Sequence, residues 1–88
     1  MFIRTPADLG AAIRERRRTL NLSQGELAKR AGVGRQWLVA VEHGKPGAEL
    51  AMVLRVLDAI SMPLMTGTAA VATGVSLDDI IASARGDA

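Results

Sequence analysis

The chain has 88 residues, of which 11 are Lys or Arg and 9 are Asp or Glu, giving a formal net charge of +2 at pH 7. A chain this short holds one domain, because it has too little interior for two cores. It contains no cysteine, which excludes disulfides and thiolate metal sites, and no apolar run approaches the roughly 20 residues that span a bilayer.

The N-terminus lacks the apolar core of a signal peptide, since Arg4 and Pro6 interrupt it early. We therefore expect a soluble, cytoplasmic protein that needs no metal or cofactor. The charge is uneven along the chain. Residues 1–47 carry nine Lys and Arg against four Asp and Glu, or +5, while residues 48–88 carry two against five, or −3. This division favours two different partners over two solvated faces with an accidental bias.

The first predicted helix covers about residues 6–20. Thr5 is a hydroxyl cap, Pro6 suits the first helical position, and Asp8 can accept hydrogen bonds from the free amides of the first turn. A cluster of arginines follows, made up of Arg14, Arg16, Arg17 and Arg18. The cluster spans more than one helical turn, so at least one of its members should point inward or along a seam.

Two short helices are predicted next, on either side of a glycine. Ser23 and Glu26 form a capping box for the first of them, and Gly32 supplies the permissive backbone of the turn. The second helix starts near Gly34 or Arg35 and ends at the glycines and proline of residues 43–47. Two helices around such a break are typical of a helix-turn-helix.

A fourth helix is predicted over residues 48–60, with apolar residues at Leu50, Val53, Leu54, Leu57 and Ile60. Residues 61–66 then lose helical periodicity, and the proline among them favours a short edge strand. Residues 67–74 are typical of a flexible connector, and a last short helix carries an apolar stripe of Leu77, Ile80, Ile81 and Ala84. That stripe can fold back on the fourth helix or dock on a partner. The predicted fold class is all-α.

The start of the second helix of the helix-turn-helix carries candidate DNA-reading side chains. Arg35 can form bidentate hydrogen bonds with a guanine edge, and Gln36 can form them with an adenine edge. Ala40 lies one turn further on the same side, where it can contact a thymine methyl. Taken alone, these residues are equally consistent with a solvated helix face. Within a helix-turn-helix, base contact is the better interpretation.

The motif resembles the Cro and phage-repressor-like (Xre) helix-turn-helix regulators over roughly residues 7–60. The resemblance rests on Leu22-Ser-Gln-x-Glu-Leu-Ala, Gly32, Leu38 and Val41-Glu42-x-Gly44-Lys45. It implies a lambda-repressor-like bundle of four main helices as the DNA-binding domain of residues 1–60. The apolar residues that follow resemble HipB-type antitoxins, in which such a strand pairs with its twin across a dimer axis and the dimer binds a HipA-type serine/threonine kinase toxin. The strand residues would be Met62, Pro63, Leu64 and Met65.

The resemblance also implies individual roles. Gln24 would contact phosphate or the outer base, Arg35, Gln36 and Ala40 would face base edges, and Lys45 would lie near a phosphate. Arg17 and Glu42 match a family pair that bridges the first helix to the end of the third. Three residues depart from the family pattern: Gly25, Gly34 and Trp37.

Several residues keep two interpretations. Trp37 is either a packing residue or a phosphate contact through its indole N–H. Arg14 and Arg18 are either solubilising or further phosphate contacts. His43 has no second ligand nearby, which argues against a metal or catalytic role, and no nucleophile with a base and an orienting group can be assembled.

The sequence thus predicts a dimeric, sequence-specific DNA-binding repressor that binds a palindromic operator. As a HipB-like antitoxin it would autoregulate a toxin-antitoxin operon and neutralise a HipA-type kinase. Two alternatives stay open: a stand-alone phage-type or housekeeping Xre repressor without a toxin, and a protein-interaction inhibitor module that does not bind DNA.

Overall fold

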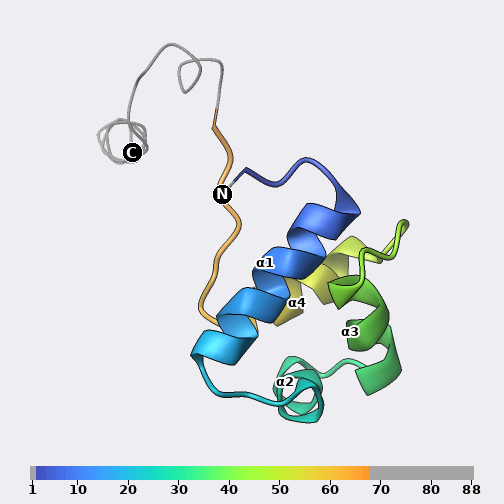
Figure 1. Cartoon of the computed structure of the whole chain (residues 1–88), viewed down its shortest axis with the longest axis vertical. Helices are drawn as coiled ribbons and strands as arrows, with labels where there is room; N and C mark the ends of the chain where they lie inside the picture. Colours follow the sequence, from blue (N-terminus) through green and yellow to red (C-terminus); the bar gives the residue numbers. More distant parts are fainter. Residues whose placement is uncertain (1, 68–88) are drawn as a thin grey trace.

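The computed structural model describes residues 2–67, which form four helices: α1 (Pro6–Thr19), α2 (Gln24–Ala31), α3 (Arg35–Glu42) and α4 (Leu50–Ala59). α1 packs on α3, and α2 packs on both α3 and α4 (Figure 1). This arrangement confirms the predicted all-α bundle with a helix-turn-helix formed by α2 and α3. No helix among the described residues is long and apolar enough to cross a membrane.

The helix starts follow the predicted capping chemistry. The Thr5 hydroxyl accepts a hydrogen bond from the Asp8 N–H, and the Asp8 carboxylate accepts one from the Arg4 N–H, which is the main reason why the pKa of Asp8 lies below its ordinary value. At α2, Ser23 and Glu26 form the reciprocal capping box with two bonds of 3.0 Å. The bond from the Ser23 N–H lowers the pKa of Glu26.

The core lies between the four helices and contains apolar side chains from each of them. Its fully buried members are Ile13, Leu27, Leu38, Val56 and Ile60. α4 begins at Leu50, two residues later than the predicted Ala48. Its buried face contains Val53, Val56 and Leu57, whereas Leu50 and Leu54 remain 64% and 42% exposed.

Two glycines have conformations or contacts that a side chain would disturb. Gly32, at the turn between α2 and α3, has a φ of 72°, in the left-handed region that favours glycine. Gly10 lies where α1 crosses the end of α3, and a Cβ built there would be 2.3 Å from the carbonyl oxygen of Val41. The two helix backbones are therefore in direct contact, which the sequence analysis did not foresee.

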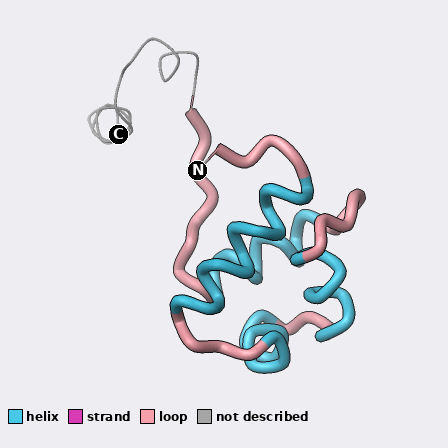
Figure 2. The backbone as a smooth tube through the Cα atoms, viewed as in Figure 1, coloured by secondary structure: helices cyan, strands magenta, loops and turns pink. Residues whose placement is uncertain are grey.

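The strand predicted over residues 61–66 is not present as a strand: residues 62–67 form a loop that leaves the bundle after α4 (Figure 2). The physical reason is that a strand needs a ladder partner, and Pro63 has no N–H to offer one. Met62 packs partly against the core, whereas Leu64 and Met65 are 56% and 49% exposed. The connector and last helix predicted beyond Gly67 lie outside the described residues.

The close crossing at Gly10 gives a stability prediction. Gly10→Ala should lower the free energy of unfolding by about 1 to 3 kcal/mol, because the new methyl group overlaps the backbone of α3. Chemical denaturation followed by circular dichroism measures the change.

Gly25→Ala is the matched control, since this helical glycine has no atom closer than 3.9 Å to a built Cβ. It should leave stability unchanged or raise it by up to about 1 kcal/mol, because alanine is the better helix former. Equal effects of the two substitutions would contradict the close crossing.

Candidate nucleic-acid interface

A buried ion pair joins α1 to the end of α3. Arg17 Nε donates to Glu42 Oε2 at 2.8 Å and Arg17 Nη2 donates to Oε1 at 3.0 Å, while Nη1 donates to the carbonyl oxygen of Leu22 at 2.9 Å. The side chains are 11% and 0% exposed. The hydrogen bonds to Glu42 raise the pKa of Arg17 above its ordinary value. This pair is the one that the family resemblance implies.

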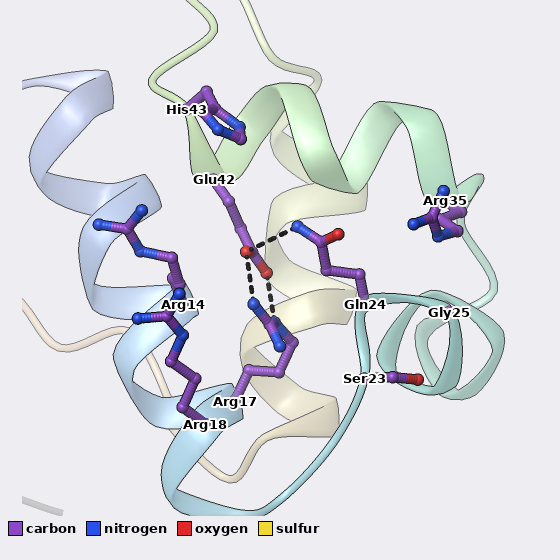
Figure 3. A pocket seen from close by; sticks show the side chains of 9 residues that line it. All are labelled: Arg14, Arg17, Arg18, Ser23, Gln24, Gly25, Arg35, Glu42 and His43. Atoms are coloured by element: carbon purple, nitrogen blue, oxygen red, sulfur yellow. Dashed lines mark hydrogen bonds and ion pairs between the residues drawn. The ribbon is translucent and has the colours of Figure 1, made fainter.

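Gln24 extends the same network to the start of α2. Its Nε2 donates to Glu42 Oε1 at 3.1 Å. Because a carboxylate only accepts hydrogen bonds, the amide nitrogen must face Glu42 and the amide oxygen must point away from it, as Figure 3 shows. The side chain expected to reach phosphate or the outer base is thus oriented by Glu42 in the free protein.

These side chains border a groove of about 510 Å³ between α1, the start of α2 and α3 (Figure 3). It is lined by Arg14, Arg17, Arg18, Ser23, Gln24, Gly25, Arg35, Glu42 and His43. The one acid in this lining, Glu42, is neutralised by Arg17. Three arginines remain to give the groove a positive potential, which suits a polyanion such as the DNA backbone.

The arginine cluster of α1 is divided among three roles. Arg14 and Arg18 line the groove, and Arg17 points inward to Glu42. Arg16 Nε donates to the carbonyl oxygen of Ile60 at 2.9 Å, at the end of α4. The sequence predicted at least one arginine inward or along a seam. The bond of Arg16 to Ile60 spans 44 positions, so no local pattern could have located it.

The start of α3 presents the predicted base-reading residues. Arg35 and Gln36 are exposed, and Ala40 is half-buried. Gly34 occupies the N-cap position without a side-chain hydrogen bond, as expected for a residue that lacks the usual hydroxyl. Trp37 is half-buried and packs partly against the core, in line with its interpretation as a packing residue.

Lys45 lies outside the groove. It borders a second, largely apolar hollow of about 360 Å³, together with residues such as Ile3, Leu9 and Val53. Its exposed side chain follows the turn after α3, where the Lys45 N–H donates to the carbonyl oxygen of Ala40 at 3.0 Å. Of the predicted DNA contacts, the structure brings Arg14, Arg18, Gln24 and Arg35 into one groove, whereas Gln36, Trp37, Ala40 and Lys45 are not part of its lining.

His43 is a groove residue that the sequence analysis considered only as a metal or catalytic candidate. It is exposed, and its Nδ1 lies 2.7 Å from the carbonyl oxygen of Val39. No group of three or more His, Cys, Asp or Glu side chains suited to a metal occurs in residues 2–67. The available signal was its position directly after Glu42, on the side of α3 that faces α1.

Comparison with known proteins agrees with this geometry. The profile of a helix-turn-helix domain family matches residues 8–64. An HTH-type transcriptional regulator of Sinorhizobium fredii is 50% identical over 58 residues, which are 66% of this chain and 76% of the relative. Another, from Methanothermobacter thermautotrophicus, is 44% identical over 48 residues, or 54% of this chain and 70% of the relative.

Solved structures of HipB share the fold. HipB in a complex with an O4 20-mer matches 78% of this chain and 97% of its own, with a TM-score of 0.72 and 22% identity. A HipA–HipB–O2–O3 complex gives a TM-score of 0.71 and 20% identity, over 77% of this chain and 96% of the matched one.

The chain therefore belongs to the helix-turn-helix family of transcriptional regulators. Within that family it is an Xre-type regulator with a HipB-like fold, as its sequence motif indicates.

The buried ion pair gives a second stability prediction. Arg17→Ala should lower the free energy of unfolding by about 3 to 5 kcal/mol, because it leaves the Glu42 carboxylate buried without its cation. Urea denaturation of the purified variant measures the loss.

The double variant Arg17→Met with Glu42→Leu is the control. It removes both charges and should recover most of the lost stability, since no unpaired charge stays in the interior. A single variant within 1 kcal/mol of the parent would contradict the role given to the pair.

Proposed function

We propose that the protein is a dimeric, sequence-specific DNA-binding repressor and the HipB-like antitoxin of a toxin-antitoxin operon. The observation that carries the DNA-binding part is the positive groove beside an exposed α3 start. Arg35 belongs to both features, because it lines the groove and opens α3 next to Gln36. A helix-turn-helix places such residues in the major groove while its flanks touch phosphates.

In the proposed complex, α3 lies in the major groove. Arg35 and Gln36 read base edges there, and Ala40 contacts a thymine methyl. Arg14 and Arg18 lie across the groove from α3, at a position suited to phosphate contacts on one flank. Lys45 approaches a phosphate on the other flank, and the Trp37 indole N–H is the remaining candidate contact.

The orientation of the Gln24 amide in the protein without DNA refines its proposed role. Its Nε2 is already engaged by Glu42, so the amide oxygen is the atom presented outward. An amide oxygen accepts a hydrogen bond from the exocyclic amino group of adenine or cytosine, whereas a phosphate offers no donor. The outer base is therefore a better partner for that oxygen than a phosphate.

The dimer is proposed to form through residues 61–66. Leu64 and Met65 expose apolar surface, and the segment beyond Met62, whose N–H donates to the carbonyl oxygen of Leu57, is a loop with which a second copy can form a two-stranded ladder. On this proposal residues 1–60 bind DNA and residues 61–66 dimerise. A dimer would then recognise a palindromic operator with half-sites about 10 base pairs or a multiple apart.

The kinase partner is supported by likeness to HipB, which forms a complex with HipA and O2–O3 in one solved structure. By analogy, this protein neutralises a HipA-type serine/threonine kinase toxin and represses their shared operon. Co-purification with the product of an adjacent gene separates this proposal from a stand-alone repressor. Tight binding of that product without salt-sensitive DNA binding would instead support an interaction module that only inhibits.

DNA recognition can be tested at Arg35. Arg35→Ala should weaken binding to the preferred duplex, selected from a random-sequence library, by about 1 to 3 kcal/mol and relax the preference at one base position. Lys45→Ala should weaken all duplexes alike and reduce the salt slope by about 1. Gel-shift titrations at several salt concentrations measure both effects.

Arg55→Ala is the matched control, since Arg55 is an exposed arginine on α4 away from the groove. It should change the affinity far less than Arg35→Ala does. An Arg35→Ala variant indistinguishable from the parent would refute the assignment of α3 as the base reader.

Dimerisation can be tested at Leu64. Leu64→Asp places a charge in the proposed apolar ladder and should raise the dimer dissociation constant at least about tenfold, a cost of roughly 1.4 kcal/mol. Sedimentation equilibrium measures it, with the exposed Leu20 changed to Asp as a control at another surface. Unchanged self-association in Leu64→Asp would refute pairing through this segment.

A further inference from the structure

His43 lies at the end of α3 and lines the groove. It is the C-cap residue of α3, and the groove lining places it with Arg14 and Arg18 (Figure 3). It is also the one histidine of the chain. Neither its position in the groove nor its chemistry is used by the base-reading role of α3.

The hydrogen bond of the ring determines which nitrogen carries the proton. Nδ1 lies 2.7 Å from the carbonyl oxygen of Val39, and a carbonyl only accepts hydrogen bonds, so Nδ1 must be the donor. In the neutral ring, Nε2 then carries a lone pair and can only accept. Phosphate oxygens in DNA also only accept, so a neutral His43 has no hydrogen bond to offer them through Nε2.

Protonation changes that property. An imidazolium donates from both nitrogens, so Nδ1 can keep its bond to Val39 while Nε2 donates to a phosphate oxygen. The end of a helix also favours a positive charge, because the last carbonyl groups carry partial negative charge.

The charged groups around His43 come from each element that packs against it. α1 contributes Arg14, Arg18 and Arg17, and the start of α3 contributes Arg35. Glu42 is the one carboxylate that lines the groove, and it is paired with Arg17 rather than with the His43 ring. The lining thus holds cations that attract a phosphate, and it holds no uncommitted anion that would stabilise an imidazolium before the phosphate arrives.

We propose that His43 is a DNA phosphate ligand that binds in its imidazolium form beside Arg14 and Arg18. Where the free ring is neutral, binding then draws a proton from solvent onto Nε2. The proposal rests on the DNA-binding function given above and adds to it a dependence of affinity on pH. Because the complex binds more protons than the free components, affinity increases as pH falls.

The pH range of the expected effect helps to assign it to His43. Histidine exchanges its proton between about pH 5 and 8, whereas ordinary carboxylates titrate below that range and lysines above it. With one histidine in the chain, a change of DNA affinity between about pH 5.5 and 7.5 that is lost in His43→Gln identifies His43.

The test is a fluorescence-anisotropy titration of the full chain against a mixed-sequence duplex, at constant ionic strength and at several pH values. A mixed-sequence duplex suffices because a phosphate contact does not depend on base identity. The parent should bind about threefold to tenfold more tightly at about pH 5.5 than at 7.5. His43→Gln, whose side chain cannot take up a proton, should show a flat profile, and Arg55→Gln should keep the slope of the parent.

The ring also gives a direct readout. In proton NMR spectra, the single histidine provides one set of ring signals, and their titration midpoint should move to higher pH when duplex is added. A midpoint that moves down or stays unchanged would overturn the proposal.

The outcomes separate this inference from the function on which it rests. DNA binding that is retained but flat in pH, or a slope that survives in His43→Gln, overturns the role of His43 and leaves the DNA-binding proposal intact. Absence of binding to any duplex at every pH overturns the proposed function itself.

Discussion

The bond between Arg17 and Glu42 is the interaction on which the geometry of the DNA-binding face depends. It is bidentate and buried, and it ties the last turn of α1 to the last residue of α3. The same carboxylate holds the amide of Gln24, so one acceptor group fixes parts of α1, α2 and α3 relative to one another. A helix-turn-helix needs that fixed relation, because the angle between its helices decides where the reading side chains meet a base pair.

The groove forms as a consequence of this pairing. Once Arg17 is used internally, the other arginines on the same side of α1 are left at the surface with no acid to neutralise them within the groove lining. α1 is thereby both a structural support and a source of positive charge. The start of α2 completes the wall of the groove, and the end of α3 contributes the imidazole ring of His43 to its lining.

Much of this could be predicted from the sequence, because the signals are local. The capping box at Ser23, the glycine turn and the apolar spacing each depend on residues a few positions apart, and the structure has the helices close to where those patterns predict them. The extent of α4 and the fate of residues 61–66 were less predictable. Where α4 starts depends on how the preceding turn packs, and a strand depends on a ladder partner that the sequence of one chain does not specify.

Contacts between residues far apart in the sequence were the hardest to predict from the sequence. Nothing in the neighbourhood of Arg16 indicates that it bonds to the end of α4, and the spacing of apolar residues says nothing about two backbones touching at Gly10. Similarly, His43 has no motif of its own, and its chemistry becomes visible only when the ring is seen against a carbonyl oxygen, in a groove that Arg14 and Arg18 also line.

The contact at Gly10 has a consequence for how such a regulator can diverge. Because α1 meets α3 through main-chain atoms, the tilt of the reading helix is insensitive to which side chains α3 carries on its outer face. Exposed positions such as 35 and 36 can therefore be exchanged without disturbing the joint beneath them. The proposed base-reading surface can therefore change in sequence while its position on the domain stays fixed, which makes this chain a practical starting point for redirecting specificity.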